Sequence, residues 1–325
     1  MSPLLSVRGL SVHFRTNQGV VRAVEKLSFD IGEGETVAIV GESGSGKSTA
    51  ALGILRLIAS PPGTIAGGEV LYEGQDLTKV TEAEIRRIRG ARISMIFQDP
   101  MMALNPVYTV GWQIAEALML HVEITPRQAA ARAVELLRLV RVPAPETRVN
   151  QYPHNLSGGM RQRVMIAMAL ACNPKLLIAD EPTTALDVTV QAQVLALIRD
   201  LKAELGMAVL LITHDLGVVA ETAARVVVMY AGGKVEEGPV KEIFRDPRHP
   251  YTQGLIRVSR WEGASGGLMP EIPGTVPSPA AMPKGCPFAP RCEHAMPLCH
   301  GEQPELFEIA GGRAVACYLA ASKAV

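Results

Sequence analysis

The chain has 325 residues, with 32 Lys and Arg balanced by 32 Asp and Glu, and 48% of its residues are hydrophobic. This size and composition provide a large core and exclude a disordered chain. Zero net charge gives no overall attraction to nucleic acid or an anionic membrane, and 4% aromatic residues disfavour a stacking surface for single strands. No apolar run of about 18 residues and no secretory signal is found, so we expect neither a transmembrane helix nor export.

Strand and helix patterns alternate along the chain. An imperfect period of two predicts a strand within 5–14, and an apolar run predicts another over 36–40. A helix is expected from about Lys47 to Ile58, stopped by the Pro-Pro-Gly turn that follows it. Buried strands are also expected in four later apolar runs, 92–97, 175–179, 208–213 and 225–230. This order predicts an α/β fold whose sheet is mostly parallel at its centre.

Two segments depart from the alternation. Between 98 and 156 only helical patterns occur, one of them capped by Thr125 with Pro126 at its first position. From Trp261 onward Gly and Pro become frequent and long apolar runs disappear. We therefore expect a core domain over 1–258 with a helical subdomain inserted at about 99–163, followed by a C-terminal extension over 259–325.

A glycine-rich loop follows the strand at 36–40 and precedes the first helix. Residues 41–48 match the pattern G-x-x-x-x-G-K-[ST] in the strand–helix context that this motif requires. Its glycines allow successive N–H groups to face phosphate oxygens, and the helix N-terminus adds positive charge. Lys47 is expected to reach the β- and γ-phosphates, and Ser48 to bind Mg²⁺.

A second part of the predicted site follows the strand at 175–179. Asp180 and Glu181 lie at its carboxyl end. Asp180 is expected in the magnesium shell, and Glu181 is placed to act as a general base on an attacking water.

Residues 156–163 predict a second anion-binding turn. Ser157 is a good N-cap, and Gly158 and Gly159 allow the backbone to approach an anion closely. No Asn-Lys-x-Asp segment for recognition of guanine occurs; Thr78–Thr81 comes nearest and lacks the aspartate. The sequence therefore does not indicate a GTPase.

These motifs, in this order, resemble those of the ATP-binding cassette superfamily over about residues 4–255. Residues 156–162 are similar to its signature motif, with Met160 where the superfamily most often has glutamine. Gln98 is similar to the Q-loop glutamine, residues 185–187 to the D-loop, and His214 to the switch histidine. The resemblance implies a phosphate-loop ATPase core with a mixed sheet, the inserted helical subdomain, and a small Cys- and Pro-rich extension.

The resemblance also implies the ligands of the site. Mg²⁺ would be held through Ser48, Gln98 and Asp180, and Phe14 would stack on adenine. The residues implied to contact ATP are Phe14, Gly41, Glu42, Ser43, Gly44, Ser45, Gly46, Lys47, Ser48, Thr49, Gln98, Ser157, Gly158, Gly159 and Gln162. Catalysis would involve Glu181, His214 and Lys47. Two cassettes would pack head to tail, so that the signature of one closes on the ATP of the other.

Three segments resemble the oligopeptide and dipeptide importer subgroup, namely 97–106, 180–193 and 247–252. This resemblance implies an unlike second ATPase subunit, two transmembrane permease subunits and an extracytoplasmic solute-binding protein, with no nucleic acid partner. The chain would lie peripherally on the cytoplasmic face of the membrane, docked through about 98–116. The subgroup also includes nickel importers. A soluble cassette ATPase acting on ribosomes or DNA is a further alternative, but such chains usually carry two cassettes, coiled-coil arms or zinc-bearing insertions.

Four of the five cysteines lie in the extension with the spacing C-x5-C-x6-C-x17-C. In a reducing compartment such thiols act as ligands more often than as disulfides. Four thiolates suit a [4Fe–4S] cluster or structural zinc, and the C-x2-C pairs common in zinc ribbons do not occur. His294 and His300 leave a mixed zinc site open, and free thiols or disulfides are a third alternative. Subgroup resemblance favours a [4Fe–4S] cluster held by Cys286, Cys292, Cys299 and Cys317.

Overall fold

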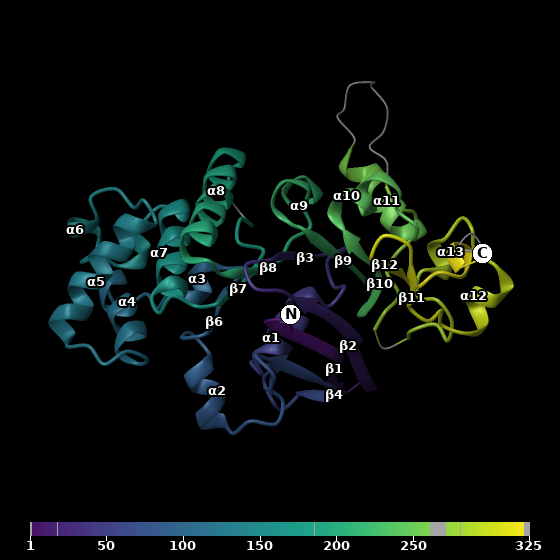
Figure 1. The fold of residues 1–325 in the computed structure, drawn as a ribbon, viewed down its shortest axis with the longest axis horizontal. Coiled ribbons are helices and arrows are strands. Elements are labelled where there is room, and N and C mark those ends of the chain that lie inside the picture. Colours follow the sequence, from purple (N-terminus) through teal and green to yellow (C-terminus); the bar gives the residue numbers. More distant parts are fainter. Residues whose placement is uncertain (1, 18, 185, 261–270, 280, 322–325) are drawn as a thin grey trace. The chain divides into compact units, whose positions relative to one another are not determined.

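A computed structural model describes residues 2–17, 19–184, 186–260, 271–279 and 281–321. The chain divides into two compact units. The first contains residues 1–31, 36–78 and 213–325, and the second contains residues 32–35 and 79–212. Each unit gathers segments that are distant in sequence, so the order of elements along the chain differs from their grouping in space (Figure 1).

The first unit contains most of the strands. Its elements are β1 (Leu5–Thr16), β2 (Gly19–Ile31), β3 (Thr36–Val40), α1 (Lys47–Ile54), β4 (Gly63–Tyr72), β5 (Gln75–Asp76), α9 (Leu216–Thr222), β9 (Arg225–Tyr230), β10 (Gly233–Pro239), α10 (Val240–Arg245), α11 (Pro250–Ser259), η2 (Ala289–Arg291), α12 (Pro297–Gly301), β11 (Phe307–Ile309), β12 (Arg313–Val315) and α13 (Tyr318–Ala321). Strands β2, β1, β4 and β5 form an antiparallel sheet in that order. A second sheet runs in the order β11, β12, β10, β9, β3.

The second unit contains three parallel strands and a group of helices. Its elements are α2 (Glu82–Ile88), β6 (Ile93–Ile96), α3 (Pro100–Ala103), α4 (Val110–Met119), α5 (Pro126–Leu139), α6 (Pro145–Arg148), η1 (Pro153–Asn155), α7 (Gly158–Leu170), β7 (Leu176–Asp180), α8 (Val188–Leu205) and β8 (Ala208–Ile212). Strand β7 lies between β6 and β8 and is parallel to both. Helices α3 to α7 gather beside one another in Figure 1.

Both parallel and antiparallel pairs occur, so the predicted mixed α/β architecture is confirmed. Strand β3 is parallel to β9, whereas β9 pairs with β10 in antiparallel fashion. The five residues of β3 are all buried, as expected for a strand covered on both faces. The predicted helix at 47–58 is shorter in the structure, because α1 ends at Ile54. The predicted cap of α5 is confirmed: Thr125 Oγ1 accepts from Gln128 N, and Pro126 is the first helical residue.

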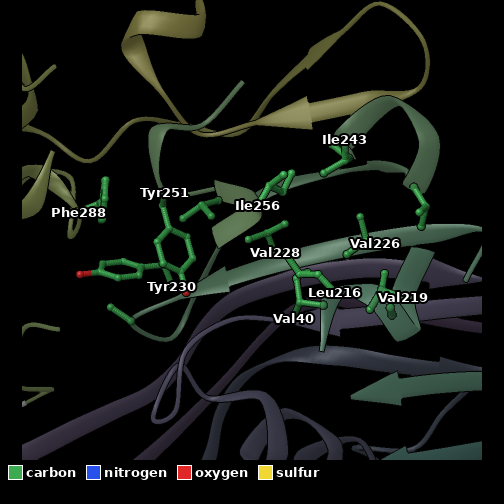
Figure 2. Close-up of a cluster of buried hydrophobic side chains, with 14 residues drawn as sticks. Val40, Leu216, Val219, Val226, Val228, Tyr230, Ile243, Tyr251, Ile256 and Phe288 are labelled. Carbon is green, nitrogen blue, oxygen red and sulfur yellow. The ribbon is translucent and has the colours of Figure 1, made fainter. Parts of the chain in front are cut away.

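The apolar side chains of the extension pack on the core of the first unit. Residues from β3, α9, β9, α10 and α11 form one buried cluster, and Phe288 of the extension belongs to it (Figure 2). Ile272, Val276 and Met282 pack against the same cluster. The segment after α11 therefore shares its apolar packing with the core, as its scarcity of apolar runs suggests.

Candidate nucleotide site

The phosphate loop lies between β3 and α1 in the first unit. Gly41 leaves β3 with φ 154°, and a Cβ there would lie 2.2 Å from the carbonyl oxygen of Met229. Gly46 precedes α1 with φ 96°, and a Cβ there would lie 2.3 Å from the carbonyl oxygen of Ala23. Both positions require glycine because the loop is pressed against the backbone of neighbouring strands. The loop is therefore held in one curved path by its surroundings.

The side chain of Lys47 turns back onto the first two residues of this loop. Its side chain is buried, and Nζ donates hydrogen bonds to the carbonyl oxygens of Gly41, at 2.9 Å, and Glu42, at 3.0 Å. A buried ammonium is stable only when such partners or an anion surround it. The lysine is thus fixed where the motif expects phosphate oxygens.

Other loop residues differ in their exposure to solvent and in their hydrogen bonding. Ser43 and Gly44 are exposed, and Ser48 and Thr49 are half-buried in the first turn of α1. Ser45 Oγ is buried, with no hydrogen-bond partner among the described residues. A buried hydroxyl without a partner is unusual and is satisfied when a polar ligand binds. The polar groups of the loop therefore have the chemistry that a phosphate requires.

Two other predicted residues lie in the first unit. His214 is exposed and follows Thr213, whose N–H donates to the carbonyl oxygen of Ile39 in β3 over 3.2 Å. The predicted switch histidine thus follows a residue that is hydrogen-bonded to β3 near the end from which the phosphate loop starts. Phe14 of β1 is half-buried beside Gly63 of β4, where a Cβ would lie 2.9 Å from the phenyl ring.

The second unit brings Gln98 and Glu181 together. Gln98 Nε2 donates to Glu181 Oε2 over 2.9 Å, and Thr184 Oγ1 donates to the same oxygen over 2.8 Å. Glu181 has φ 45°, a left-handed conformation that is uncommon for residues other than glycine. Asp180, the preceding residue, is buried at the end of β7. Strained backbone held by specific contacts is typical of functional positions.

The signature turn begins α7 in the same unit. Ser157 is the N-cap and accepts from Met160 N, as predicted. A Cβ on Gly158 would lie 3.7 Å from Leu186, and one on Gly159 would lie 2.8 Å from Val190. The turn therefore packs on Leu186 of the predicted D-loop and on the start of α8. Ala185, the first D-loop residue, lies outside the described residues.

The predicted site residues are divided between the two units. The first unit contains the phosphate loop, Phe14 and His214, and the second contains Gln98, Asp180, Glu181 and the signature turn. Gln162 of that turn is buried, and its Nε2 has no hydrogen-bond partner in the described part of the chain. Thr184, which holds Glu181, was missed by sequence reasoning although it lies beside the predicted carboxylates.

The four cysteines of the extension line one pocket in the first unit, together with His249 and His294. Burial, with smaller contributions from the nearby Cys299 and Cys317, raises the pKa of the Cys286 thiol to about 11. The four thiols thus lie close to one another. Over the described ranges, however, no three His, Cys, Asp or Glu side chains are arranged to hold a metal ion. All five cysteines of the chain are free of disulfides.

Comparisons with known proteins agree with this geometry. Residues 24–184 match the family model "ABC transporter", and residues 235–299 match "Oligopeptide/dipeptide transporter, C-terminal region". The chain is 54% identical to "Probable peptide ABC transporter ATP-binding protein y4tR" of Sinorhizobium fredii (strain NBRC 101917 / NGR234), over 97% of this chain and 94% of that protein. It is 53% identical to "Oligopeptide transport ATP-binding protein OppD" of Bacillus subtilis (strain 168), over 97% of this chain and 88% of that one.

A solved structure shows the same fold. The "Dimeric structure of a post-hydrolysis state of the ATP-binding cassette MJ0796 bound to ADP and Pi" aligns with a TM-score of 0.65 and 30% identity, over 73% of this chain and 98% of that one. The resemblance to the ATP-binding cassette superfamily is thereby confirmed, and the two relatives named above extend it along 97% of the chain. The chain belongs to the ATP-binding cassette transporter family and carries the C-terminal region of its oligopeptide and dipeptide transporters.

Proposed function

We propose that this ATPase energises the uptake of dipeptides and oligopeptides as one subunit of an importer. The observation that carries the proposal is the joining, in one chain, of a cassette core to the oligopeptide/dipeptide C-terminal region. The two relatives named above carry the names of peptide transport ATP-binding proteins. The match to this chain covers 94% of one and 88% of the other. The same subgroup contains nickel importers, so nickel is the alternative cargo.

ATP is the substrate in the proposed mechanism. The backbone N–H groups of the loop bind its phosphates, and Lys47 Nζ stabilises negative charge on the γ-phosphoryl group. Glu181 accepts a proton from the attacking water while Gln98 and Thr184 hold its carboxylate. His214 contacts the γ-phosphoryl group, and Phe14 stacks on adenine.

Mg²⁺, when bound, neutralises charge on the phosphate oxygens. The residues proposed to hold it are Ser48 and, from the second unit, Gln98 and Asp180. Hydroxyl, amide and carboxylate oxygens are the hard donors that Mg²⁺ prefers, so this donor set fits the ion.

A complete site requires two cassettes. The chain contains one phosphate loop and one signature turn, and we propose that each closes on the complementary motif of a second, unlike ATPase subunit. We propose the same domain organisation as predicted above. It consists of a nucleotide-binding domain over 1–258, with a helical subdomain inserted at about 99–163, and the extension over 259–325.

The helical subdomain supplies a surface for the membrane subunits. Within the described ranges, no helix is long and apolar enough to cross a bilayer. Around α3 and α4, however, large apolar side chains are exposed: Met101 (56%), Met102 (86%), Val107 (70%) and Trp112 (41%). Such a patch is typical of a protein interface. We propose that it docks on two permease subunits at the cytoplasmic face of the membrane, in a complex served by an extracytoplasmic solute-binding protein and without nucleic acid.

A [4Fe–4S] cluster on Cys286, Cys292, Cys299 and Cys317 is the proposed cofactor of the extension. Four thiols that line one pocket fit the donor set of such a cluster. Bound there, the cluster would cross-link loops that have little core of their own. Zinc is the alternative occupant. Protein purified without oxygen is expected to contain iron and labile sulfide, whereas colourless protein with stoichiometric zinc would exclude the cluster.

Recovery of the native complex tests the proposed function. The tagged full chain is purified from native membranes in mild detergent, and its companions are identified by mass spectrometry. The proposal predicts two membrane subunits, a second cassette chain and a peptide-binding protein. Ribosomal or DNA-repair proteins in their place would contradict it, and a nickel-binding protein would reassign the cargo.

A further inference from the structure

Arg291 of the extension is a buried residue whose guanidinium reaches the phosphate loop. Its side chain is 4% exposed. Nη1 donates to Glu42 Oε2 over 2.7 Å and Nη2 donates to Glu42 Oε1 over 3.1 Å, a two-point contact with the second residue of the loop. Arg291 and Glu42 are 249 residues apart and both belong to the first unit.

The remaining donors of Arg291 are also engaged. Nε donates to the carbonyl oxygen of Pro273 over 2.8 Å, Nη2 to that of Ile272 over 2.9 Å, and Nη1 to Tyr230 Oη over 3.3 Å. Together with the two bonds to Glu42, these contacts use all five N–H groups of a guanidinium. A lysine cannot reproduce this planar fork.

Glu42 is gripped at three points. Arg291 holds its carboxylate, its own N–H donates to Tyr251 Oη over 2.8 Å, and its carbonyl oxygen accepts from Lys47 Nζ. Arg291 and Tyr251 therefore fix Glu42, the residue whose backbone carbonyl accepts from Lys47. A change that moves the Glu42 side chain is therefore expected to move the carbonyl oxygen of the same residue, which accepts from Lys47.

Aromatic rings hold Arg291 and Tyr251 in place. Tyr230 lies with its ring centroid 4.6 Å from that of Tyr251 and 5.2 Å from that of Phe288 (Figure 2). The guanidinium carbon of Arg291 lies 5.8 Å from the Tyr230 ring centroid and 5.9 Å from that of Phe288. Because the rings and the arginine pack against one another, the arginine has little freedom to leave the loop.

We infer that Arg291 is a positioning residue of the phosphate loop, which makes the extension part of the nucleotide site. A buried ion pair is by itself weak support for a stabilising role. Here one member of the pair is Glu42, whose carbonyl oxygen accepts from Lys47. Breaking the pair is therefore expected to change the affinity for ATP. The inference rests on the proposed role of Lys47 and the loop, and it does not depend on what the cysteines hold.

The test measures ATP affinity and thermal unfolding of the full chain with the variants Arg291→Met, Arg291→Lys and Glu42→Gln. Arg291→Met is expected to weaken ATP binding by about tenfold or more, because a displaced loop loses aligned contacts. Arg291→Lys keeps the charge but not the fork, so it is expected to fall between Arg291→Met and the unchanged chain. In the assembled transporter, KM for ATP is expected to rise more than kcat falls.

Glu42→Gln weakens the two-point contact with Arg291 by changing the carboxylate and leaves the arginine in place. If Arg291→Met does not fold, the ATP affinity of Glu42→Gln tests the inference instead. Arg257→Met is the matched control, since this exposed arginine lines the same pocket as Arg291 but makes no hydrogen bond or ion pair to the phosphate loop among the described residues. Folded Arg291 and Glu42 variants with ATP affinity within twofold of the unchanged chain would overturn the inference. Lys47→Ala separates the two claims: if it binds ATP normally, the proposed site itself fails.

Discussion

Gln98 and Glu181, 83 residues apart, are joined by a hydrogen bond of 2.9 Å from the amide Nε2 to the carboxylate Oε2. The first residue follows β6 and the second follows β7, two adjacent parallel strands. Adjacent parallel strands end at the same edge of a sheet, so residues that follow them meet there. The predicted Q-loop glutamine and the proposed general base are thus joined by a direct hydrogen bond, and we propose that the amide orients the carboxylate.

Replacing Glu181 by Gln tests the general base. The variant keeps the size of the side chain but cannot accept the proton of the attacking water. ATP hydrolysis is expected to fall by roughly 10²- to 10⁴-fold while ATP binding is retained. Phosphate release and nucleotide affinity measure the two effects separately. Near-normal turnover would remove Glu181 from this role.

Gln98→Ala is expected to lower hydrolysis by about tenfold to a hundredfold, because Glu181 loses a side-chain donor and, with it, its alignment. Thr184→Ala removes a second donor to the same oxygen and is expected to act in the same direction. Combining the two changes should cost more than either one. Turnover of the double variant equal to that of the unchanged chain would show that neither donor orients the carboxylate.

Gly159→Ala tests the packing of the signature turn. The added Cβ would lie 2.8 Å from Cγ1 of Val190, so we expect a loss of about 1–3 kcal/mol in the free energy of unfolding. Val190→Ala removes the obstructing methyl groups, and the double variant should recover part of the loss. Chemical denaturation of the three variants measures this. If the double variant is no more stable than Gly159→Ala alone, the contact is not the cause.

Two glycines of the phosphate loop form a matched pair. Gly46→Ala adds a Cβ 2.3 Å from a backbone oxygen at φ 96°, whereas Gly44→Ala adds one with nothing within 4 Å at φ 77°. Both replacements introduce strain of about 1–3 kcal/mol, but only the first also displaces the loop from β2. Gly46→Ala is therefore expected to weaken ATP binding much more strongly. Equal loss in both variants would contradict the close approach.

Metal analysis of serine variants tests the cysteine pocket. Cys299→Ser is expected to lower the iron content of anaerobically purified protein sharply, because a cluster loses one of four ligands. Cys172→Ser is the control: Cys172 lies in the second unit, where its thiol donates to Ala117 O over 3.7 Å. Iron that is lost equally in both variants, or retained in both, would contradict the assigned ligand set.

Local patterns predicted much of the fold. The strands at 36–40 and 225–230 appear as β3 and β9, and the caps at Thr125 and Ser157 are present in the structure. These features depend on neighbours in sequence, such as a short apolar run or a hydroxyl one residue before a helix. The long strand β2 was missed because its burial alternates irregularly, with polar residues on both sides.

The contacts that orient the site were less accessible to sequence reasoning. The motif order predicted Lys47 and Glu181, yet nothing in the spacing of the extension singled out Arg291 among its prolines and cysteines. Its pairing with Glu42 depends on how α11 and the extension pack over β9, which a single sequence does not encode in any local pattern. The left-handed backbone of Glu181 likewise follows from its surroundings.

Peptide uptake in cells that lack this chain tests the central claim most directly. Cells complemented with the unchanged chain are expected to accumulate labelled di- and oligopeptides, and cells complemented with Glu181→Gln are expected to accumulate neither. Labelled nickel serves as the second cargo in the same cells. Peptide uptake that is equal in complemented and uncomplemented cells would contradict a peptide importer, and restored nickel uptake alone would assign the ATPase to that metal.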